Sequence, residues 1–276
     1  MITIITIAYN EEENIERTIK SVLSQDFTDY EYIIKDGGSS DGTAEKAESY
    51  RELFERKGVA YKVISSKDKG IYDAMNIAVS EARGDWTAFM NAGDEYFSDH
   101  VFKGIFANND WRGTDLIYGD TAEEEYGELH YFRKCPELIE KRMPFSHQSV
   151  FARTELLRQF PFDLKWRIGA DYDFLLKCHK AGKKFADSGV LVAKISKTGV
   201  SSLKLKDTYL ETIAIKRERG VEIPDEKEMK KELISISIRQ FGMDNFPDFL
   251  KYWIRKVQRK MRKQKRVQRS SESKWE

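Results

Sequence analysis

Residues 1–90 alternate short apolar runs with longer segments in which apolar residues recur every three or four positions. The apolar runs have the length of strands and are rich in β-branched residues, which predicts buried strands. The longer segments predict helices with one apolar face. The predicted strands are Ile2–Ala8, Tyr30–Lys35, Val59–Ser65 and Trp86–Met90. This alternation of strand and helix is typical of a parallel sheet with right-handed crossovers.

The predicted fold class is therefore α/β, with a mainly parallel central sheet flanked by helices and a Rossmann-like first half. In open sheets of this kind, ligands bind in the crevice outside the carboxyl ends of the strands. We expect the functional residues of this chain to lie where its strands end.

The pattern is weaker after residue 97, but it still predicts further strands and helices. The predicted strands are Asp115–Tyr118, Leu129–Arg133, Phe145–Arg153 and an edge strand at Lys184–Ile195, with an acidic loop at Asp120–Gly127. The predicted helices are Thr154–Phe160, one that begins near Ile168, Leu203–Arg219 and Glu226–Phe241. A break at Gly220–Pro224 divides the chain into a main domain, 1–220, and a helical extension, 221–276.

Composition narrows the class of protein. Hydrophobic residues make up 40% and aromatic residues 12% of 276 residues, which argues against disorder over most of the chain. No apolar run reaches the ~18 residues that span a bilayer, and the amino-terminal run has no basic leader. Cys135 and Cys178 lack metal-ligand spacing, so we expect free thiols and a cytoplasmic protein.

Polar clusters follow the predicted strands, and their order along the chain is specific. They read Ala8-Tyr-Asn-Glu-Glu12, Asp36-Gly-Gly-Ser-Ser-Asp-Gly-Thr43, Asp68-Lys-Gly-Ile-Tyr-Asp-Ala-Met-Asn76, Ala82-Arg-Gly-Asp-Trp86 and Asn91-Ala-Gly-Asp94, with Gly169-Ala-Asp171 further on. Taken alone, Asn91–Asp94 reads as an ordinary turn. The set of motifs together resembles the family-2 glycosyltransferases of the GT-A fold, which implies an inverting enzyme that uses a nucleotide-sugar donor.

The resemblance assigns the amino-terminal motifs to the donor. Asp36 can accept a hydrogen bond from the imide N–H of a uracil or thymine base. Because Ser39, Ser40 and Asp41 are better placed to cap the next helix, we expect the Asp36 carboxylate to be free for the ligand. The residues expected to complete the donor pocket are Ala8, Tyr9 and Glu12 around the base, Lys69 and Asp73 near the diphosphate, and Asn91 and Asp94. A plain surface lysine is the alternative for Lys69.

Asn91–Asp94 occupies the position of the family's Asp-X-Asp motif, which binds a divalent ion that bridges the donor phosphates. Asn91 and Gly93 replace two of its acids, so Asp94 is the acid that remains. Mg²⁺ is often held by one or two carboxylates together with phosphate oxygens and water, so one aspartate is sufficient. We expect Mn²⁺ or Mg²⁺ as the cofactor, with Asp94 as its ligand.

The acceptor side is assigned to His147 and Gln148, although a packed or surface histidine is the alternative for His147. The resemblance makes Asp171 the general base that deprotonates the acceptor hydroxyl, and a single in-line displacement implies inversion. Asp173 is the alternative base. Both aspartates lie in the first turn of a predicted helix, where carboxylates are also favourable for the helix dipole.

Residues 246–269 combine aromatic and aliphatic residues at helical spacing with a dense set of lysines and arginines. Such a segment can lie on an anionic membrane surface or pack on the body of the protein. Nucleic-acid binding is disfavoured because no recognised nucleic-acid module accompanies the cations. The loop Ser196–Ser202 is expected to close over the donor.

We therefore predict a glycosyltransferase that moves a sugar from a UDP- or dTDP-sugar to a saccharide or lipid-linked saccharide in cell-surface polysaccharide biosynthesis, peripheral on the inner membrane face. The alternative is a catalytically inactive nucleotide-sugar-binding or scaffold protein on the same fold, which the thinned Asp-X-Asp motif supports. A nucleotidyltransferase is disfavoured because Tyr9–Glu12 is not a glycine-rich basic phosphate loop.

Overall fold

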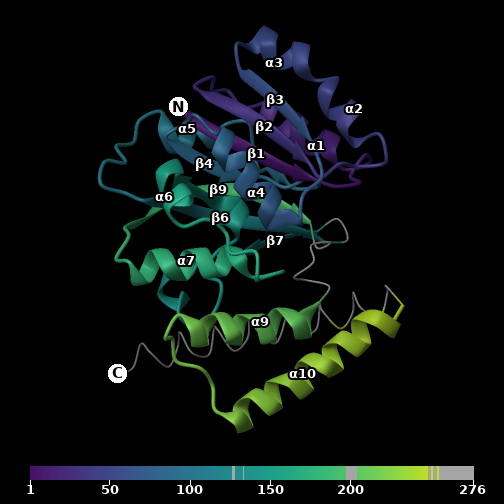
Figure 1. Ribbon diagram of the computed structural model, residues 1–276, viewed down its shortest axis with the longest axis vertical. Coiled ribbons are helices and arrows are strands. Elements are labelled where there is room, and N and C mark those ends of the chain that lie inside the picture. Colours follow the sequence, from purple (N-terminus) through teal and green to yellow (C-terminus); the bar gives the residue numbers. More distant parts are fainter. Residues whose placement is uncertain (126–127, 133, 197–203, 248–249, 251–253, 255–276) are drawn as a thin grey trace. The chain divides into compact units, whose positions relative to one another are not determined.

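The computed structural model describes residues 1–125, 128–132, 134–196, 204–247, 250 and 254 (Figure 1). The chain forms two compact units. One comprises Met1–Ser202 and Thr208–Ile223, and the other comprises Leu203–Asp207 and Pro224–Glu276. The predicted boundary between a main domain, 1–220, and an extension, 221–276, remains a proposal.

The strands are β1 (Ile2–Ala8), β2 (Tyr30–Asp36), β3 (Ala60–Ser65), β4 (Trp86–Phe89), β5 (Glu95–Tyr96), β6 (Leu116–Glu125), β7 (Glu128–Phe132), β8 (Val150–Arg153) and β9 (Phe185–Ser196). The α-helices are α1 (Ile15–Leu23), α2 (Thr43–Glu48), α3 (Arg51–Lys57), α4 (Ile71–Glu81), α5 (Val101–Phe106), α6 (Thr154–Gln159), α7 (Ala170–Lys180), α9 (Leu205–Glu218) and α10 (Glu226–Asn245). Two short 3₁₀ turns are η1 (Pro136–Leu138) and η2 (His147–Ser149).

The strands form one mixed sheet in the order β3-β2-β1-β4-β8-β6-β9-β5, with β7 paired to β6. The first four strands in this order are parallel. All seven residues of β1 and of β2 are buried, as expected for central strands covered on both faces. The predicted parallel half of an α/β fold is confirmed.

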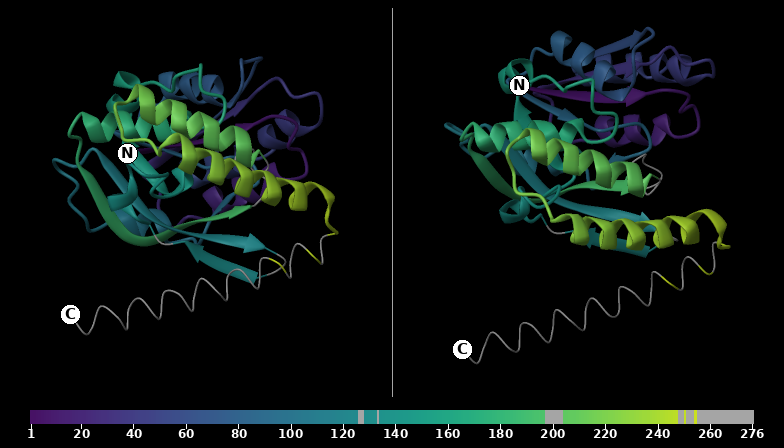
Figure 2. Two further views of the ribbon diagram at one scale, coloured as in Figure 1. Left: turned by 90° about the horizontal axis from the view of Figure 1, so that it is seen from below. Right: turned by 60° about the horizontal axis from the view of Figure 1, so that its bottom comes forward.

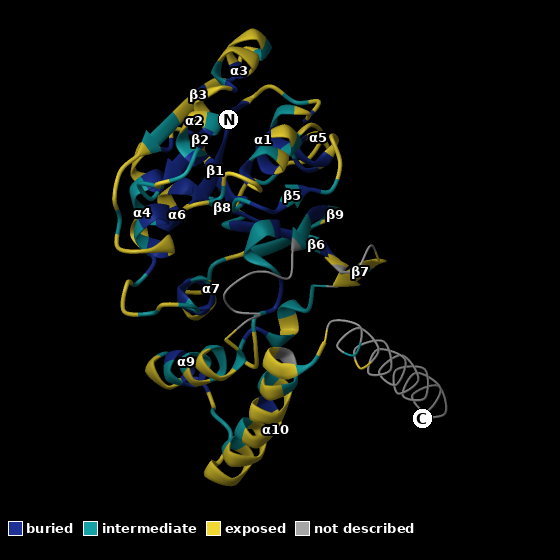
Figure 3. Ribbon diagram, turned by 90° about the vertical axis from the view of Figure 1, so that its right-hand side faces the viewer, coloured by how far each residue is buried: buried dark blue, intermediate teal, exposed yellow. Residues whose placement is uncertain are grey.

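Side chains of successive residues in β1 and β2 point to opposite faces of the sheet, so these strands contribute to two hydrophobic cores. On one face, Ile5, Ile7 and Ile33 pack in a cluster with residues of α4, α6 and α7. On the other face, Ile4 and Tyr32 pack in a cluster with residues of α1, α3 and α5. Figure 3 shows the buried strands between the helices of this unit.

The second half of the sheet, in which β6 and β9 are parallel and the other pairs antiparallel, differs from the sequence prediction. The predicted edge strand at Lys184–Ile195 is wrong as an edge, because β9 lies between β6 and β5 and pairs with both. Its second partner, β5, has only two residues, which is too short for the pattern of apolar and polar positions to predict a strand. The helix α5 was also not predicted.

The predicted acidic loop at Asp120–Gly127 is wrong over its described part. Residues as far as Glu125 continue β6 and pair with β7 and β9. Glu123 is buried, and Glu124 forms an ion pair with Lys194 of β9. A run of glutamates is typical of a loop. Here the backbone of these residues pairs with β7 and β9, and Lys194 offsets part of their negative charge.

The structure corrects a further boundary. The strand predicted at Phe145–Arg153 begins only at Val150, because η2 precedes it. The segment between β2 and β3 forms two short helices, α2 and α3. The helices predicted near Thr154, Ile168, Leu203 and Glu226 are confirmed as α6, α7, α9 and α10.

The segment Ala82–Trp86 joins α4 to β4 against the start of β1. A Cβ atom on Gly84 would lie 2.6 Å from the backbone nitrogen of Thr3, so no side chain fits there. The buried Glu31 accepts hydrogen bonds from the Arg83 backbone N–H and its Nε. This motif therefore has a packing function.

No helix within the described residues is long and apolar enough to cross a bilayer. The predicted loop Ser196–Ser202 and the basic segment 246–269 lie almost entirely outside the described residues, so both remain predictions.

Candidate active site

The predicted donor residues lie along the carboxyl edge of the parallel strands. Ala8 of β1 is the register partner of Asp36 in β2, and Asp36 is the partner of Ser65 in β3. The loop Asn91–Asp94 follows β4, which pairs with β1. The chain's topology thus brings residues from four distant segments to one edge, as expected for an open α/β sheet.

The loops after β1 and β2 are interlocked. Asn10, with φ of 53°, accepts a hydrogen bond at Oδ1 from the Ser40 N–H. The Glu12 carboxylate accepts the Gly42 N–H at 3.2 Å, and the Glu12 N–H donates to the Asp41 carboxylate. Glu12 is exposed and holds the start of α2, so its predicted part in a base pocket remains a proposal.

Asp36 is fully buried, and both carboxylate oxygens are occupied by the protein. Oδ2 accepts the Gly38 N–H at 3.1 Å and the Ser65 hydroxyl at 2.6 Å, and Oδ1 accepts the Ser39 hydroxyl. Burial raises the Asp36 pKa, but these hydrogen bonds outweigh burial and hold the pKa below its usual value. The expectation that this carboxylate is free is wrong, because Ser39 binds Asp36 as well as shaping the loop.

Tyr9 is the exposed aromatic residue at the end of β1, with 63% of its surface accessible. Its ring lies beside Gly37, since a Cβ atom added to Gly37 would be 3.1 Å from Tyr9 Cδ2. The Gly37 N–H donates to the buried Ala8 carbonyl at 2.9 Å. An exposed aromatic face next to a glycine offers a stacking surface for a planar ring.

Lys35 is a residue of this edge that the sequence analysis missed. Its side chain is fully buried, and Nζ donates to the Asp36 carbonyl at 2.7 Å, the Ser66 carbonyl at 2.6 Å and the Asp68 carboxylate at 2.9 Å. The ion pair fixes the segment after β3 onto the end of β2. A lysine at the end of the run Tyr30–Lys35 was the available signal.

Asp68 and Asp73 organise the start of α4. Asp68 Oδ1 accepts the Gly70 N–H at 3.0 Å, and Asp73 Oδ2 accepts the Lys69 N–H at 2.8 Å. Gly70 has φ of 121°, which favours glycine. The Lys69 side chain is exposed at this helix start. The predicted donor roles of Lys69 and Asp73 remain proposals.

Thr18 of α1 holds the loop Asn91–Asp94 from behind. Its buried hydroxyl donates to the Asp94 carbonyl at 2.6 Å and accepts the Gly93 N–H at 3.0 Å. Gly93 has φ of 95°, a left-handed conformation that suits glycine. The glycine in place of an acid is therefore a requirement of this turn.

The predicted acceptor residues reach this same loop. Gln148 Nε2 donates to Asp94 Oδ2 at 2.7 Å, and Asp94 is only 7% exposed. Asn91 Nδ2 lies 3.1 Å from His147 Nε2. The turn η2 thus joins the segment after β4, and residues predicted to act on donor and acceptor lie side by side.

His147 also connects to Asp171. His147 Nδ1 lies 3.3 Å from Asp171 Oδ2, and the two side chains are 25% and 21% exposed. Asn91 thus contacts one ring nitrogen of His147, and Asp171 contacts the other. Asp171 Oδ1 accepts the Tyr172 N–H at 2.8 Å. His147 therefore lies between Asn91 and Asp171 and contacts both of them.

Tyr72 approaches Asp171 from α4. Its hydroxyl donates to the Ile168 carbonyl and lies 3.3 Å from Asp171 Oδ1. Burial, followed by the negative charge of Asp171, raises the Tyr72 pKa well above its ordinary value. Tyr72 therefore stays a neutral hydrogen-bond donor beside the carboxylate.

Asp173, the alternative base, is fully buried and is paired within the protein. Arg219 Nε lies 2.6 Å from Oδ1, and Lys177 Nζ lies 2.8 Å from Oδ2. The hydrogen bond to Asp173 raises the Arg219 pKa despite partial burial. The carboxylate is inaccessible to a substrate, so Asp173 as a base is wrong.

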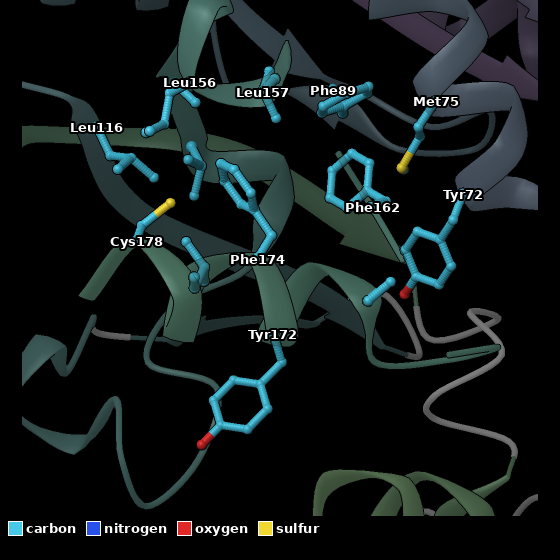
Figure 4. Close-up of a cluster of buried hydrophobic side chains, with 14 of the residues drawn as sticks. Tyr72, Met75, Phe89, Leu116, Leu156, Leu157, Phe162, Tyr172, Phe174 and Cys178 are labelled. Atoms are coloured by element: carbon cyan, nitrogen blue, oxygen red, sulfur yellow. The ribbon is translucent and has the colours of Figure 1, made fainter. Parts of the chain in front are cut away.

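His147 and Asp171 line part of a mostly apolar cavity of about 20 Å³, which has room for about one water molecule. Its lining includes Met75, Phe89, Leu157, Phe162 and Phe174, which Figure 4 shows gathered from several elements. The side chains of His147 and Asp171 therefore border a mostly apolar cavity.

No group of three or more His, Cys, Asp or Glu side chains suited to a metal ion occurs in the part of the chain that the structure describes. Asp94 offers one carboxylate at the edge of the site. Such a donor set fits a hard divalent cation only when a bound ligand and water supply the other oxygens.

Comparison with known proteins identifies the protein family of this chain. The model of a family described as Glycosyl transferase family 2 matches residues 3–163, more than half of the chain. A PGL/p-HBAD biosynthesis glycosyltransferase of Mycobacterium bovis is 29% identical over 184 residues, which cover 64% of this chain and 69% of that protein.

Two solved structures share the fold. Staphylococcus aureus TarS 1–349 in complex with UDP-GlcNAc has a TM-score of 0.64 at 17% identity, covering 88% of this chain and 72% of that chain. The mannosyltransferase PcManGT of Pyrobaculum calidifontis, in complex with GDP-Man and Mn²⁺, has a TM-score of 0.60 at 18% identity, covering 87% and 69%.

Proposed function

The chain belongs to glycosyl transferase family 2 and has the GT-A fold, and on this basis we propose that it transfers a sugar from a UDP- or dTDP-sugar, with inversion, to a saccharide or lipid-linked saccharide. The observation that carries the proposal is the position of His147 in contact with both Asn91 and Asp171, next to the hydrogen bond between Gln148 and Asp94. It joins a predicted donor loop to a predicted base within one site.

On the donor side, Tyr9 provides a face for the base, and the interlocked loops with Ala8, Glu12 and Asp36 form its surroundings. Both oxygens of the Asp36 carboxylate already accept hydrogen bonds from the protein. Binding of a base therefore requires that one oxygen accept an additional hydrogen bond, or that a base replace one of the present donors. We propose that the exposed Lys69 at the start of α4 binds the diphosphate of the donor. The amino terminus of a helix also favours binding of such an anion.

Asp94 is the proposed ligand for Mn²⁺ or Mg²⁺, with the remaining oxygens from the donor diphosphate and water. A divalent ion bound there stabilises the negative charge of the leaving nucleoside diphosphate. Gln148 keeps the carboxylate oriented by its hydrogen bond to Oδ2. The complex of PcManGT with GDP-Man and Mn²⁺ supports the use of a divalent ion by similarity of fold.

Asp171 is the proposed general base. The acceptor hydroxyl transfers its proton to Asp171 as its oxygen forms a bond to the anomeric carbon. The bond from that carbon to the diphosphate oxygen breaks on the opposite face, and the nucleoside diphosphate leaves with the electron pair. Tyr72, the Tyr172 N–H and His147 hold the carboxylate in place for this step.

The turnover experiment incubates the purified protein with UDP-, dTDP- and GDP-sugars and Mn²⁺ or Mg²⁺, and measures released nucleoside diphosphate. We expect release from a UDP- or dTDP-sugar and its loss on chelation. If folded protein binds a nucleotide sugar but never releases diphosphate with any acceptor tested, the inactive scaffold becomes the better description. The replacement of two acids in the Asp-X-Asp motif is the observation that favours that second candidate.

The membrane part of the proposal gains support from α10, which belongs to the second unit. At about 100° per residue, one face of this helix carries Lys227, Lys230, Lys231, Ile234, Ile238 and Phe241. The three apolar side chains on it are 62–68% exposed, and the charged side chains on it are lysines. Apolar side chains flanked by cations suit the surface of an anionic bilayer, on which a lipid-linked acceptor would lie.

We expect the variant Ile234→Ser/Ile238→Ser/Phe241→Ser to lose several-fold of its co-sedimentation with vesicles of phosphatidylglycerol and phosphatidylcholine. The matched control Leu129→Ser/Tyr131→Ser removes exposed apolar residues from β7 and should bind as the wild type. Equal sedimentation of both variants and the wild type would reject α10 as the membrane contact and leave only the predicted segment 246–269.

A further inference from the structure

Glu211 of α9 contacts the loop that precedes the proposed base. Its Oε1 accepts the backbone N–H of Ile168 and that of Gly169, each at 2.8 Å. Glu211 lies beyond residue 163, at which the match to the family ends. The part of α9 from Thr208 onward belongs to the first unit, in which α7 and its loop also lie (Figures 1 and 2).

Tyr72 binds the same peptide from the other side. The peptide group between Ile168 and Gly169 has its carbonyl bound by the Tyr72 hydroxyl and its N–H bound by Glu211. There is little space around it, because a Cβ atom on Gly169 would lie 2.8 Å from Ile215 Cδ1. Both polar groups of one peptide are therefore fixed, two residues before Asp171.

This peptide also forms the start of α7. The first N–H groups of a helix have no partner within the helix, and a side chain usually caps them. Gly169 is the N-cap residue of α7 and has no side chain with which to cap it. Glu211 places a carboxylate at this helix start from a different helix, where negative charge is favourable.

We propose that Glu211 is a positioning residue for Asp171, an inference that rests on the proposed function of Asp171 as the base. Asp171 lies in the first turn of α7, so a shift of the Ile168–Gly169 peptide moves its carboxylate relative to His147 and the acceptor hydroxyl. A misplacement of about 1 Å can cost about 10²-fold in rate. Glu211 acts on the chemical step and leaves the donor residues on β1 to β4 untouched.

The test compares Glu211→Ala, Glu211→Gln and the control Glu218→Ala. Glu218 lies on the same helix and pairs with Lys165 of the same loop at 2.6 Å, without touching the peptide before Asp171. We expect Glu211→Ala to lower kcat by about 10- to 100-fold with the donor KM within about twofold. Glu211→Gln should restore most of kcat, because its amide oxygen can accept both N–H groups. Glu218→Ala should match the wild type.

A second measurement does not depend on turnover. The NMR signals of the His147 imidazole report its contact with Asp171, and they should shift in Glu211→Ala but not in Glu218→Ala. An unchanged kcat and unchanged His147 signals in Glu211→Ala would overturn the inference. A kcat in Glu211→Gln as low as that in Glu211→Ala, with both folded, would also overturn it. A shift of His147 in a protein with no turnover would leave the positioning intact and reject the proposed function.

Discussion

Asp171→Asn should lower kcat by about 10²- to 10⁴-fold, the range expected for loss of a general base, while donor affinity stays within about twofold. The amide cannot take the acceptor proton at the pH of the reaction. Its oxygen can still accept the Tyr172 N–H, so the start of α7 should keep its geometry. Steady-state kinetics with the identified donor, and titration of the variant with the nucleoside diphosphate, measure the two effects separately.

The matched comparison for Asp171→Asn is Asp173→Asn, in the same helical turn. Asp173 is buried against Arg219 and Lys177, so its neutralisation should reduce thermal stability more than catalysis of the folded protein. A turnover of Asp171→Asn comparable to that of the wild type would reject Asp171 as the base.

Lys35→Met should lower the free energy of unfolding by about 3–5 kcal/mol, the cost of breaking a buried ion pair by removing one partner. The substitution leaves the Asp68 carboxylate, the Asp36 carbonyl and the Ser66 carbonyl without their shared donor in a mostly buried place. Denaturant unfolding, followed by circular dichroism, measures the loss.

Lys62→Met is the control for Lys35→Met. Lys62 lies on the neighbouring strand β3 and pairs with Glu81 on the surface, with half of its side chain exposed. Exposed ion pairs contribute about 0–1 kcal/mol, so this variant should unfold close to the wild type. If Lys35→Met were no less stable than Lys62→Met, the buried pair would not hold the end of β2 as described.

The parallel half of the fold was predictable because its signals are local. A central strand such as β1 is apolar except at Thr3 and Thr6, and helices such as α4 repeat their apolar face within the same segment. The mixed half, formed by β5 to β9, depends on which strands pair. Nothing in the sequence of β9 indicates that the two-residue strand β5 covers its outer edge, and the glutamates of β6 conceal a paired strand.

The site was predictable where a motif carries the chemistry. Asn91, Asp94, His147, Gln148 and Asp171 come from distant segments, and the structure brings them together through two hydrogen bonds and the contact between His147 and Asp171. These contacts show that the five residues lie close together, whereas their roles remain proposals.

The supporting residues were missed because their function arises only from tertiary contact. Thr18 reads in the sequence as one polar residue in an amphipathic helix, and Glu211 as one acid on a late helix. Tyr72 likewise carries no sign of its contact with the loop before Asp171. Asp36 and Asp173 were misjudged for the same reason, since the partners that occupy them come from Ser65 and Arg219.

The central claim is that the carboxyl edge of β1 to β4 binds a nucleotide-sugar donor together with a divalent ion at Asp94. Calorimetric titration with UDP, dTDP and GDP, in the presence of Mn²⁺ and again after chelation, tests this claim most directly. We expect UDP or dTDP to bind with Mn²⁺, at least about tenfold weaker binding after chelation and in Asp94→Ala, and wild-type affinity in Asp171→Asn. Absence of binding of all three nucleotides to the folded protein, or binding that neither chelation nor Asp94→Ala weakens, would contradict it.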